Sequence, residues 1–115
     1  MGGNYTQDPF ETFWDKRGPI TALAGYDATT SWSVDIKAQA CKSILVKNTG
    51  AAGLTWNIIG SLDNGEEFDY TVKADNAIAA GQQEFYSFTT HFTNIKIQVK
   101  GIGGIAIIKV TASGN

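Results

Sequence analysis

Residues 95–110, IKIQVKGIGGIAIIKV, decide the fold class. In the first half, apolar and polar residues alternate, which is typical of a strand with one buried and one exposed face. The second half, Ile105 to Val110, is apolar on both faces, because Ile105 and Ile107 lie opposite the face that the other apolar residues form. The glycines between the halves predict a hairpin loop. The second apolar face needs a cover, which is either another part of this chain or another molecule.

The rest of the chain shows short apolar–polar alternations between turn signals such as Asn48-Thr49-Gly50 and Asp63-Asn64-Gly65. Alternation places Trp32 and Trp56 at inward, core positions, and Gly60 marks a bulge or a close contact. The predicted strands are 31–38, 43–48, 55–62, 68–72, 84–88, 95–100 and 105–112, with an eighth around 20–24 and a loop over 74–81. Seven or eight strands at this spacing predict an all-β fold: a single antiparallel β-sandwich, jelly-roll-like, with an N-terminal arm.

The arm is rich in aromatic residues that precede the regular strands. Asp8 as a cap and Pro9 at the first position predict a short helix over 9–17, which ends at Gly18-Pro19. We therefore divide the chain into an arm of residues 1–19 and a sandwich of residues 20–115. The arm docks either on its own sandwich or on a partner, since exposed aromatic residues favour interfaces. Its candidate partner-contact residues are Phe10, Phe13 and Trp14.

Length and composition indicate one domain and exclude several function classes. The chain has 115 residues, of which 43% are hydrophobic and 17% charged, and its formal net charge is −2. A nucleic-acid-binding domain usually carries a basic excess, which this chain lacks. No apolar run approaches the roughly 20 residues of a membrane-spanning helix. The N-terminus has no basic start or apolar stretch, so no signal peptide is expected.

No pattern of catalytic, cofactor-binding or metal-ligating residues is present. The chain has one cysteine, Cys41, and one histidine, His91, so neither an intrachain disulfide nor a His/Cys metal cluster is expected. The acidic stretch 61–70 does not have the spacing of an EF-hand calcium loop and is typical of a solvated hairpin tip. Glu66 and Glu67 are adjacent, so in a strand they point to opposite faces and cannot flank one glycosidic bond. The protein is therefore expected not to be an enzyme.

Several turns and strands together resemble a known kind of protein. They are Asn48-Thr49-Gly50, Gly60 to Gly65, Ala79-Ala80-Gly81 and Ile95 to Gly104, within residues 41–112. This pattern resembles the small β-sandwich structural proteins of tailed-bacteriophage virions, of the capsid-decoration or fibre type. The resemblance implies a non-enzymatic role in the virion and self-association, often as trimers, with capsid or other virion proteins as further partners.

Two hypotheses follow for the function. The first is a virion structural protein, a capsid decoration or cement protein or a fibre-associated one, which assembles through the aromatic arm and through Ile105 and Ile107. The alternative is an extracellular carbohydrate-binding β-sandwich module that stacks sugars on Tyr70 and Tyr86. Neither hypothesis requires a cofactor, a nucleic acid or a membrane.

Overall fold

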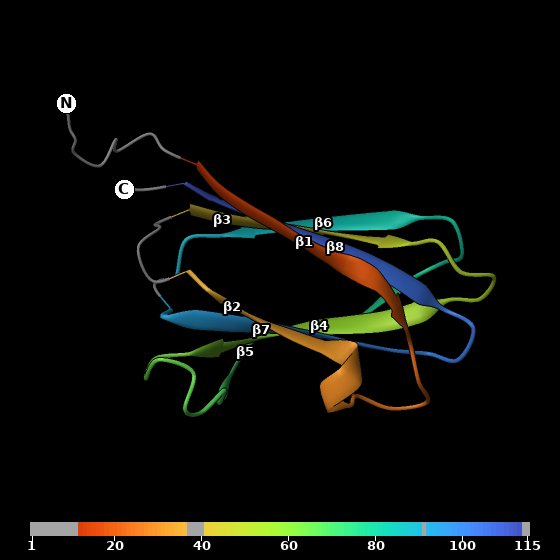
Figure 1. Cartoon of the computed structure of the whole chain (residues 1–115), viewed down its shortest axis with the longest axis horizontal. Coiled ribbons are helices and arrows are strands. Elements are labelled where there is room, and N and C mark those ends of the chain that lie inside the picture. Colours follow the sequence, from red (N-terminus) through yellow and green to blue (C-terminus); the bar gives the residue numbers. More distant parts are fainter. Residues whose placement is uncertain (1–11, 37–40, 91, 114–115) are drawn as a thin grey trace.

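The protein is a sandwich of two antiparallel sheets, each of four strands (Figure 1). The computed structural model describes residues 12–36, 41–90 and 92–113. The elements are β1 (Thr12–Thr21), the 3-10 turn η1 (Ala28–Thr30), β2 (Ser31–Asp35), β3 (Cys41–Asn48), β4 (Leu54–Ser61), β5 (Tyr70–Ile78), β6 (Gln83–Phe88), β7 (Asn94–Lys100) and β8 (Ile105–Ser113).

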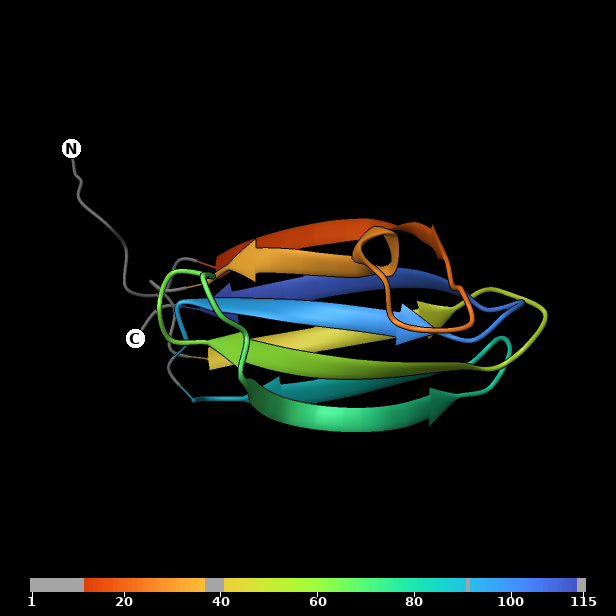
Figure 2. The ribbon, with the colours of Figure 1, turned by 90° about the horizontal axis from the view of Figure 1, so that it is seen from below.

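The strand order is that of a jelly roll. Sheet A has the order β1-β8-β3-β6 and sheet B the order β2-β7-β4-β5. Among the described strands, only β4 and β5 are both consecutive and paired, while every other connection passes from one sheet to the other. Figure 2 shows β1 and β2 along one edge of the sandwich and β5 and β6 along the opposite edge. Eight strands in two four-stranded sheets with this order confirm the predicted fold class.

The core lies between the sheets and is built from alternate residues of each strand. Trp56 and Ile58 of β4, Ile97 of β7 and Ile108 of β8 are fully buried there. Trp56 also donates a hydrogen bond from Nε1 to Oε1 of Glu84 at 3.0 Å. Trp32 is only half-buried, at the edge of this core.

Asn48 joins the connections at one end of the sandwich. Its side chain is buried and donates through Nδ2 to the carbonyl oxygens of Ala52 at 2.8 Å and Ile78 at 3.1 Å. Its Oδ1 accepts from the backbone N–H groups of Gly50 at 3.0 Å and Ile105 at 3.3 Å. One side chain thus fixes the β3–β4 turn against the end of β5 and the start of β8.

The close contact expected at Gly60 is present. A Cβ built on Gly60 would lie 2.5 Å from the ring of Phe92. The pairing of β4 with β5 also shifts register between Trp56 and Ile59. The glycine is therefore required by the aromatic side chain that packs on it.

The helix predicted over 9–17 is wrong for residues 12–17, and residues 9–11 lie outside the described residues. Residues 12–17 form the first part of β1, whose partners on β8 run from Ser113 to Ile108. The cap and proline signals are local, and pairing with the apolar strand β8 outweighs them. β1 continues past residue 19, so the proposed boundary falls inside a strand, and whether residues 1–19 form a separable arm stays a prediction.

The predicted hairpin of residues 95–112 is also wrong. β7 pairs with β2 and β4, whereas β8 pairs with β1 and β3, so the glycine-rich connection carries the chain from sheet B to sheet A. Gly101 and Gly103 have positive φ angles (126° and 92°), which glycine adopts readily, and these angles let the chain turn between the two sheets. The predicted loop over 74–81 is wrong for its first part, because β5 extends to Ile78.

Candidate assembly surface

The outer face of sheet A is an open surface, and alternation along β8 decides which residues lie on it. Ala106, Ile108 and Val110 face the core and are buried, so Ile105 and Ile107 face outward. β8 lies between β1 and β3, so this strand with two apolar faces is an inner strand of sheet A and not an edge strand. No second layer of the described chain lies over this outer face (Figure 1).

One row of side chains crosses the whole outer face. Phe85 of β6 is opposite Leu45 of β3, which is opposite Lys109 of β8, which is opposite Lys16 of β1. Phe85 is 65% exposed and Leu45 is half-buried. This row therefore presents an apolar half and a cationic half to solvent.

The neighbouring rows mix the two kinds of side chain across the strands. Trp14, opposite Thr111, is 71% exposed, and Ile107 lies opposite Lys47. The described residues that alternation places on this face, which we call face A, are Trp14, Lys16, Thr21, Ser43, Leu45, Lys47, Gln83, Phe85, Ser87, Ile105, Ile107, Lys109 and Thr111.

Face A carries three lysines and, among its described residues, no carboxylate. Lys16 and Lys109 are directly opposite each other on neighbouring strands, an arrangement that costs free energy because like charges repel. No ion pair within the described part of the chain neutralises either of them. Face A therefore combines apolar side chains with lysines that have no acidic partner among the residues that the structure describes. A partner that carries negative charges and some apolar surface would complement it.

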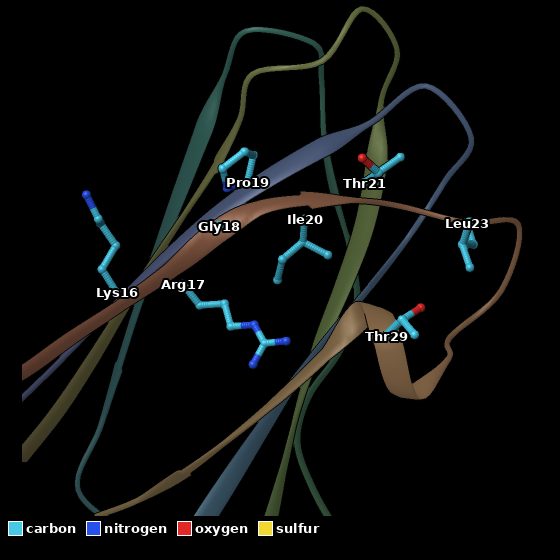
Figure 3. A pocket seen from close by; sticks show the side chains of 8 residues that line it. All are labelled: Lys16, Arg17, Gly18, Pro19, Ile20, Thr21, Leu23 and Thr29. Atoms are coloured by element: carbon cyan, nitrogen blue, oxygen red, sulfur yellow. The ribbon is translucent and has the colours of Figure 1, made fainter.

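The free edge of β1 carries several features that discourage a further strand from pairing. Pro19 lacks a backbone N–H, and the register of β1 shifts between Arg17 and Ile20. Arg17 points to the opposite side from Lys16, toward the space between the sheets (Figure 3). A shallow groove there is lined by Lys16, Arg17, Gly18, Pro19, Ile20, Thr21, Leu23 and Thr29. These features favour contacts through face A over contacts that extend the sheet.

The structure brings together part of the residue set predicted from the sequence. Trp14, Ile105 and Ile107 lie on face A, at different distances from its centre. Phe10 lies outside the described residues, and the side chain of Phe13 is also outside the described part. The prediction missed Leu45 and Phe85, although alternation within their predicted strands already placed both on the face opposite the core.

The two tyrosines of the carbohydrate hypothesis lie at the opposite edge of the sandwich, between β5 and β6. A ladder of rings connects them: Tyr70 to Phe92 at 5.6 Å, Phe92 to Phe88 at 6.2 Å, and Phe88 to Tyr86 at 6.1 Å between centroids. Lys73 Nζ lies 5.0 Å from the centroid of Tyr86. Tyr86 is thus half-buried in its own packing and Tyr70 is 56% exposed, so at most Tyr70 offers an open ring. Sugar binding stays a prediction.

The acidic β4–β5 loop is organised by hydrogen bonds. Asp63 accepts from Ser61 Oγ at 2.7 Å and from the backbone N–H of Glu67 at 3.0 Å. The bonds from Glu67 and then Ser61 lower the pKa of the Asp63 carboxyl. Among the described residues, no group of three or more potential metal ligands is present, and no helix is long and apolar enough to cross a membrane.

Comparisons with known proteins show the fold alone. No family model and no curated protein matches this sequence. The solved structure of the SPBc2 prophage-derived protein YomS is 10% identical, with coverage of 93% of this chain and 98% of that one and a TM-score of 0.53. PirA is 11% identical, with coverage of 91% and 94% and a TM-score of 0.53. Bacillus endospore appendages, described as disulfide-linked pili, are 14% identical over 91% and 87%, with a TM-score of only 0.48.

Proposed function

We propose that the protein is a non-enzymatic structural protein of a virion that acts by protein–protein assembly, as a capsid decoration or cement protein or as a fibre-associated protein. The observation that carries the proposal is face A. Phe85, 65% exposed, is opposite the half-buried Leu45, and the same face carries Trp14, 71% exposed, with the half-buried Ile105 and Ile107. Exposed aromatic residues next to aliphatic ones mark interaction sites on soluble proteins.

The choice of a virion rests on two further points. The turns and strands of residues 41–112 resemble tailed-phage structural proteins, and the jelly roll is a fold that viral capsid proteins use, as do lectin domains. The fold shared with prophage-derived YomS is consistent with this origin. The partners in this proposal are further copies of the chain and the other proteins of the particle.

Light scattering on a sizing column tests the proposal with the full chain and two variants. Phe85→Ser removes the large exposed apolar side chain that β6, the edge strand beside β3, contributes to face A. Ile102→Ser removes another large exposed apolar side chain, 75% exposed against 65% for Phe85, from the β7–β8 connection, and serves as the matched control. We expect the wild type and Ile102→Ser to form an oligomer, and Phe85→Ser to associate roughly 10- to 150-fold more weakly, since burying one large apolar side chain is worth about 1.5–3 kcal/mol.

Two results would contradict the proposal. One is a wild-type chain that stays monomeric up to about 1 mM, a concentration at which even a weak dimer is populated. The other is a Phe85→Ser chain that assembles like the wild type while circular dichroism shows that both are folded.

A further inference from the structure

The molecule carries two exposed surfaces of opposite charge. Face A holds Lys16, Lys47 and Lys109 without a carboxylate among its described residues. The β4–β5 loop, residues 62–69, holds Asp63, Glu66, Glu67 and Asp69, all exposed, without a basic residue. Within the described part of the chain neither surface is neutralised by an ion pair.

Apolar side chains flank the charges on both surfaces. Leu62, at the start of the loop, is 65% exposed, and Tyr70, directly after it, is 56% exposed. On face A, Phe85 and Leu45 lie beside Lys109 in one row. The loop therefore complements face A in two ways. Its carboxylates can pair with the lysines, and its large apolar side chains can pack against Phe85 and Leu45.

The loop has a defined shape before any contact is made. Ser61 Oγ accepts from the backbone N–H of Gly65 at 3.0 Å, and the N–H of Asn64 donates to Thr93 Oγ1 at 2.9 Å. Phe68 is fixed on sheet B, where Lys96 Nζ lies 4.4 Å from the centroid of its ring. Little conformational entropy would be lost when such a loop docks, which favours its use as a binding element.

The two surfaces lie on different sides of the molecule. Face A is the outer side of the sheet formed by β1, β8, β3 and β6, and the loop projects from an end of the other sheet (Figures 1 and 2). A copy therefore cannot place its own loop on its own face A. A contact between the two surfaces joins different patches of two copies, and such contacts repeat to give a ring or a filament.

Resting on the assembly function proposed above, we infer that face A binds the acidic β4–β5 loop of a second copy of this chain. The lysines of face A meet Glu66, Glu67 and Asp69 of that loop, and Phe85 and Leu45 meet its Leu62 and Tyr70. The occupant of face A is thus a defined segment of the same protein. An anionic partner such as a nucleic acid is the competing occupant, which the net charge of −2 disfavours because it repels a polyanion overall.

Charge reversal tests the contact in the full chain. The face variant is Lys16→Glu with Lys109→Glu, and the loop variant is Glu66→Lys with Glu67→Lys; all four positions are exposed, so folding is expected to be retained. Each variant alone places like charges at the contact, and we expect its self-association to weaken on the order of a hundredfold. In an equimolar mixture the two variants can alternate: the negative face A of one meets the positive loop of the other with swapped signs, and the second contact keeps its wild-type signs. Association should therefore recover in sedimentation velocity.

Matched controls separate the contact from the change in net charge. Ser33→Glu with Ala77→Glu adds two negative charges to exposed positions of sheet B away from the loop, and Lys16→Gln with Lys109→Gln removes two positive charges from face A. Both change the net charge by −2, and only the second should weaken assembly. Wild-type association should also weaken as the salt concentration rises.

The outcomes distinguish this inference from the assembly proposal. If the loop variant assembles like the wild type while the face variant and Phe85→Ser do not, face A mediates assembly but its occupant is another surface, and the inference is wrong. A mixture that stays dissociated would also overturn it. If neither charge variant nor Phe85→Ser alters the wild-type oligomer, the assembly proposal fails together with the inference. A mobility-shift assay in which the wild type binds a mixed-sequence oligonucleotide at face A, with loss in the face variant, would assign that surface to the competing partner.

Discussion

At the scale of single residues, Asn48 is the polar group on which one end of the sandwich depends. Its side chain makes four hydrogen bonds to backbone groups of the connections around it. Asn48→Ala leaves these backbone groups without partners in a site closed to water. We expect the free energy of unfolding to fall on the order of 3 kcal/mol. Urea unfolding followed by tryptophan fluorescence measures it. Asn76→Ala, which loses only one 3.4 Å bond to Trp56, should cost less than half as much.

Gly60 leads to a second prediction at this scale, because the Phe92 ring leaves no room for a side chain at this position. A methyl group on Gly60 would overlap the Phe92 ring, while nothing lies within 4 Å of a Cβ on Gly25. Gly60→Ala should therefore lower the free energy of unfolding by about 1–3 kcal/mol, and Gly25→Ala should leave it nearly unchanged. If the overlap is the cause, Phe92→Leu should lessen the added cost of Gly60→Ala in a double-mutant cycle.

Tyr26 makes the stability of the folded chain depend on pH in the alkaline range. Its hydroxyl donates to Asp75 Oδ1 at 3.0 Å. Burial, followed by this bond and the charge of Asp75, raises the pKa of Tyr26 from 10.0 to about 12. Because the folded state holds the proton more tightly than the unfolded state, the associated stability is complete below pH 10 and declines as pH rises toward 12.

Unfolding measured between pH 9 and 12 should show this decline in the wild type. Tyr26→Phe has no proton to lose and Asp75→Asn has no charge at the bond, so both variants should show a shallower decline. The absorbance of tyrosinate provides an independent check, since Asp75→Asn should move one tyrosine to a lower titration midpoint. An unchanged titration in Asp75→Asn would show that Asp75 does not contribute to the raised pKa of Tyr26.

At the scale of elements, alternation in the sequence predicts the faces of strands but not their neighbours. The segments 43–48, 84–88 and 95–100 form strands close to the predicted bounds, because one buried face per strand gives a clear period of two. The pairing of β7 and β8 could not be predicted in this way. Both strands bury one face in the same core, so their patterns are equally compatible with a hairpin and with a crossing between sheets.

The same limit applies to the candidate assembly surface. The two apolar faces of Ile105 to Val110 indicated a surface in need of a cover, and the structure places this strand in the middle of sheet A. Phe85 and Leu45 join Ile107 on one face only because β6 and β3 lie on that side of β8, which is a result of topology. The sequence thus predicts residues of two strands of face A, Trp14 of β1 and the two isoleucines of β8, and the strand order adds those of β3 and β6.

The role of β1 leads to a prediction at this scale. Residues 12–17 pair with six positions of β8, so a chain beginning at Gly18 loses this pairing and exposes the edge of β8. Compared with a chain beginning at Thr12, we expect the midpoint of thermal unfolding to fall by more than about 5 °C, with a lower soluble fraction. Equal stability of the two chains would show that residues 12–17 behave as a removable arm, as the sequence first suggested.

At the scale of the whole molecule, assembly and stability are expected to be linked. A partner that binds only the folded chain stabilises it by mass action, so the unfolding midpoint of a self-associating protein rises with its own concentration. We therefore expect a higher midpoint for the wild type at high than at low protein concentration. Ile102→Ser should keep this dependence, because Ile102 lies in a connection away from face A.

Phe85→Ser should lose most of the concentration dependence while its midpoint at high dilution stays close to that of the wild type. The reason is that Phe85 faces solvent in the single copy, so its removal affects the contact between copies more than the fold. Differential scanning calorimetry over a wide range of protein concentrations measures both quantities on the same samples. A wild-type midpoint that does not change with protein concentration would show that face A is not where copies meet. If Phe85→Ser lowers the midpoint by the same amount at high dilution and at high concentration, Phe85 stabilises the single chain and not a contact between copies.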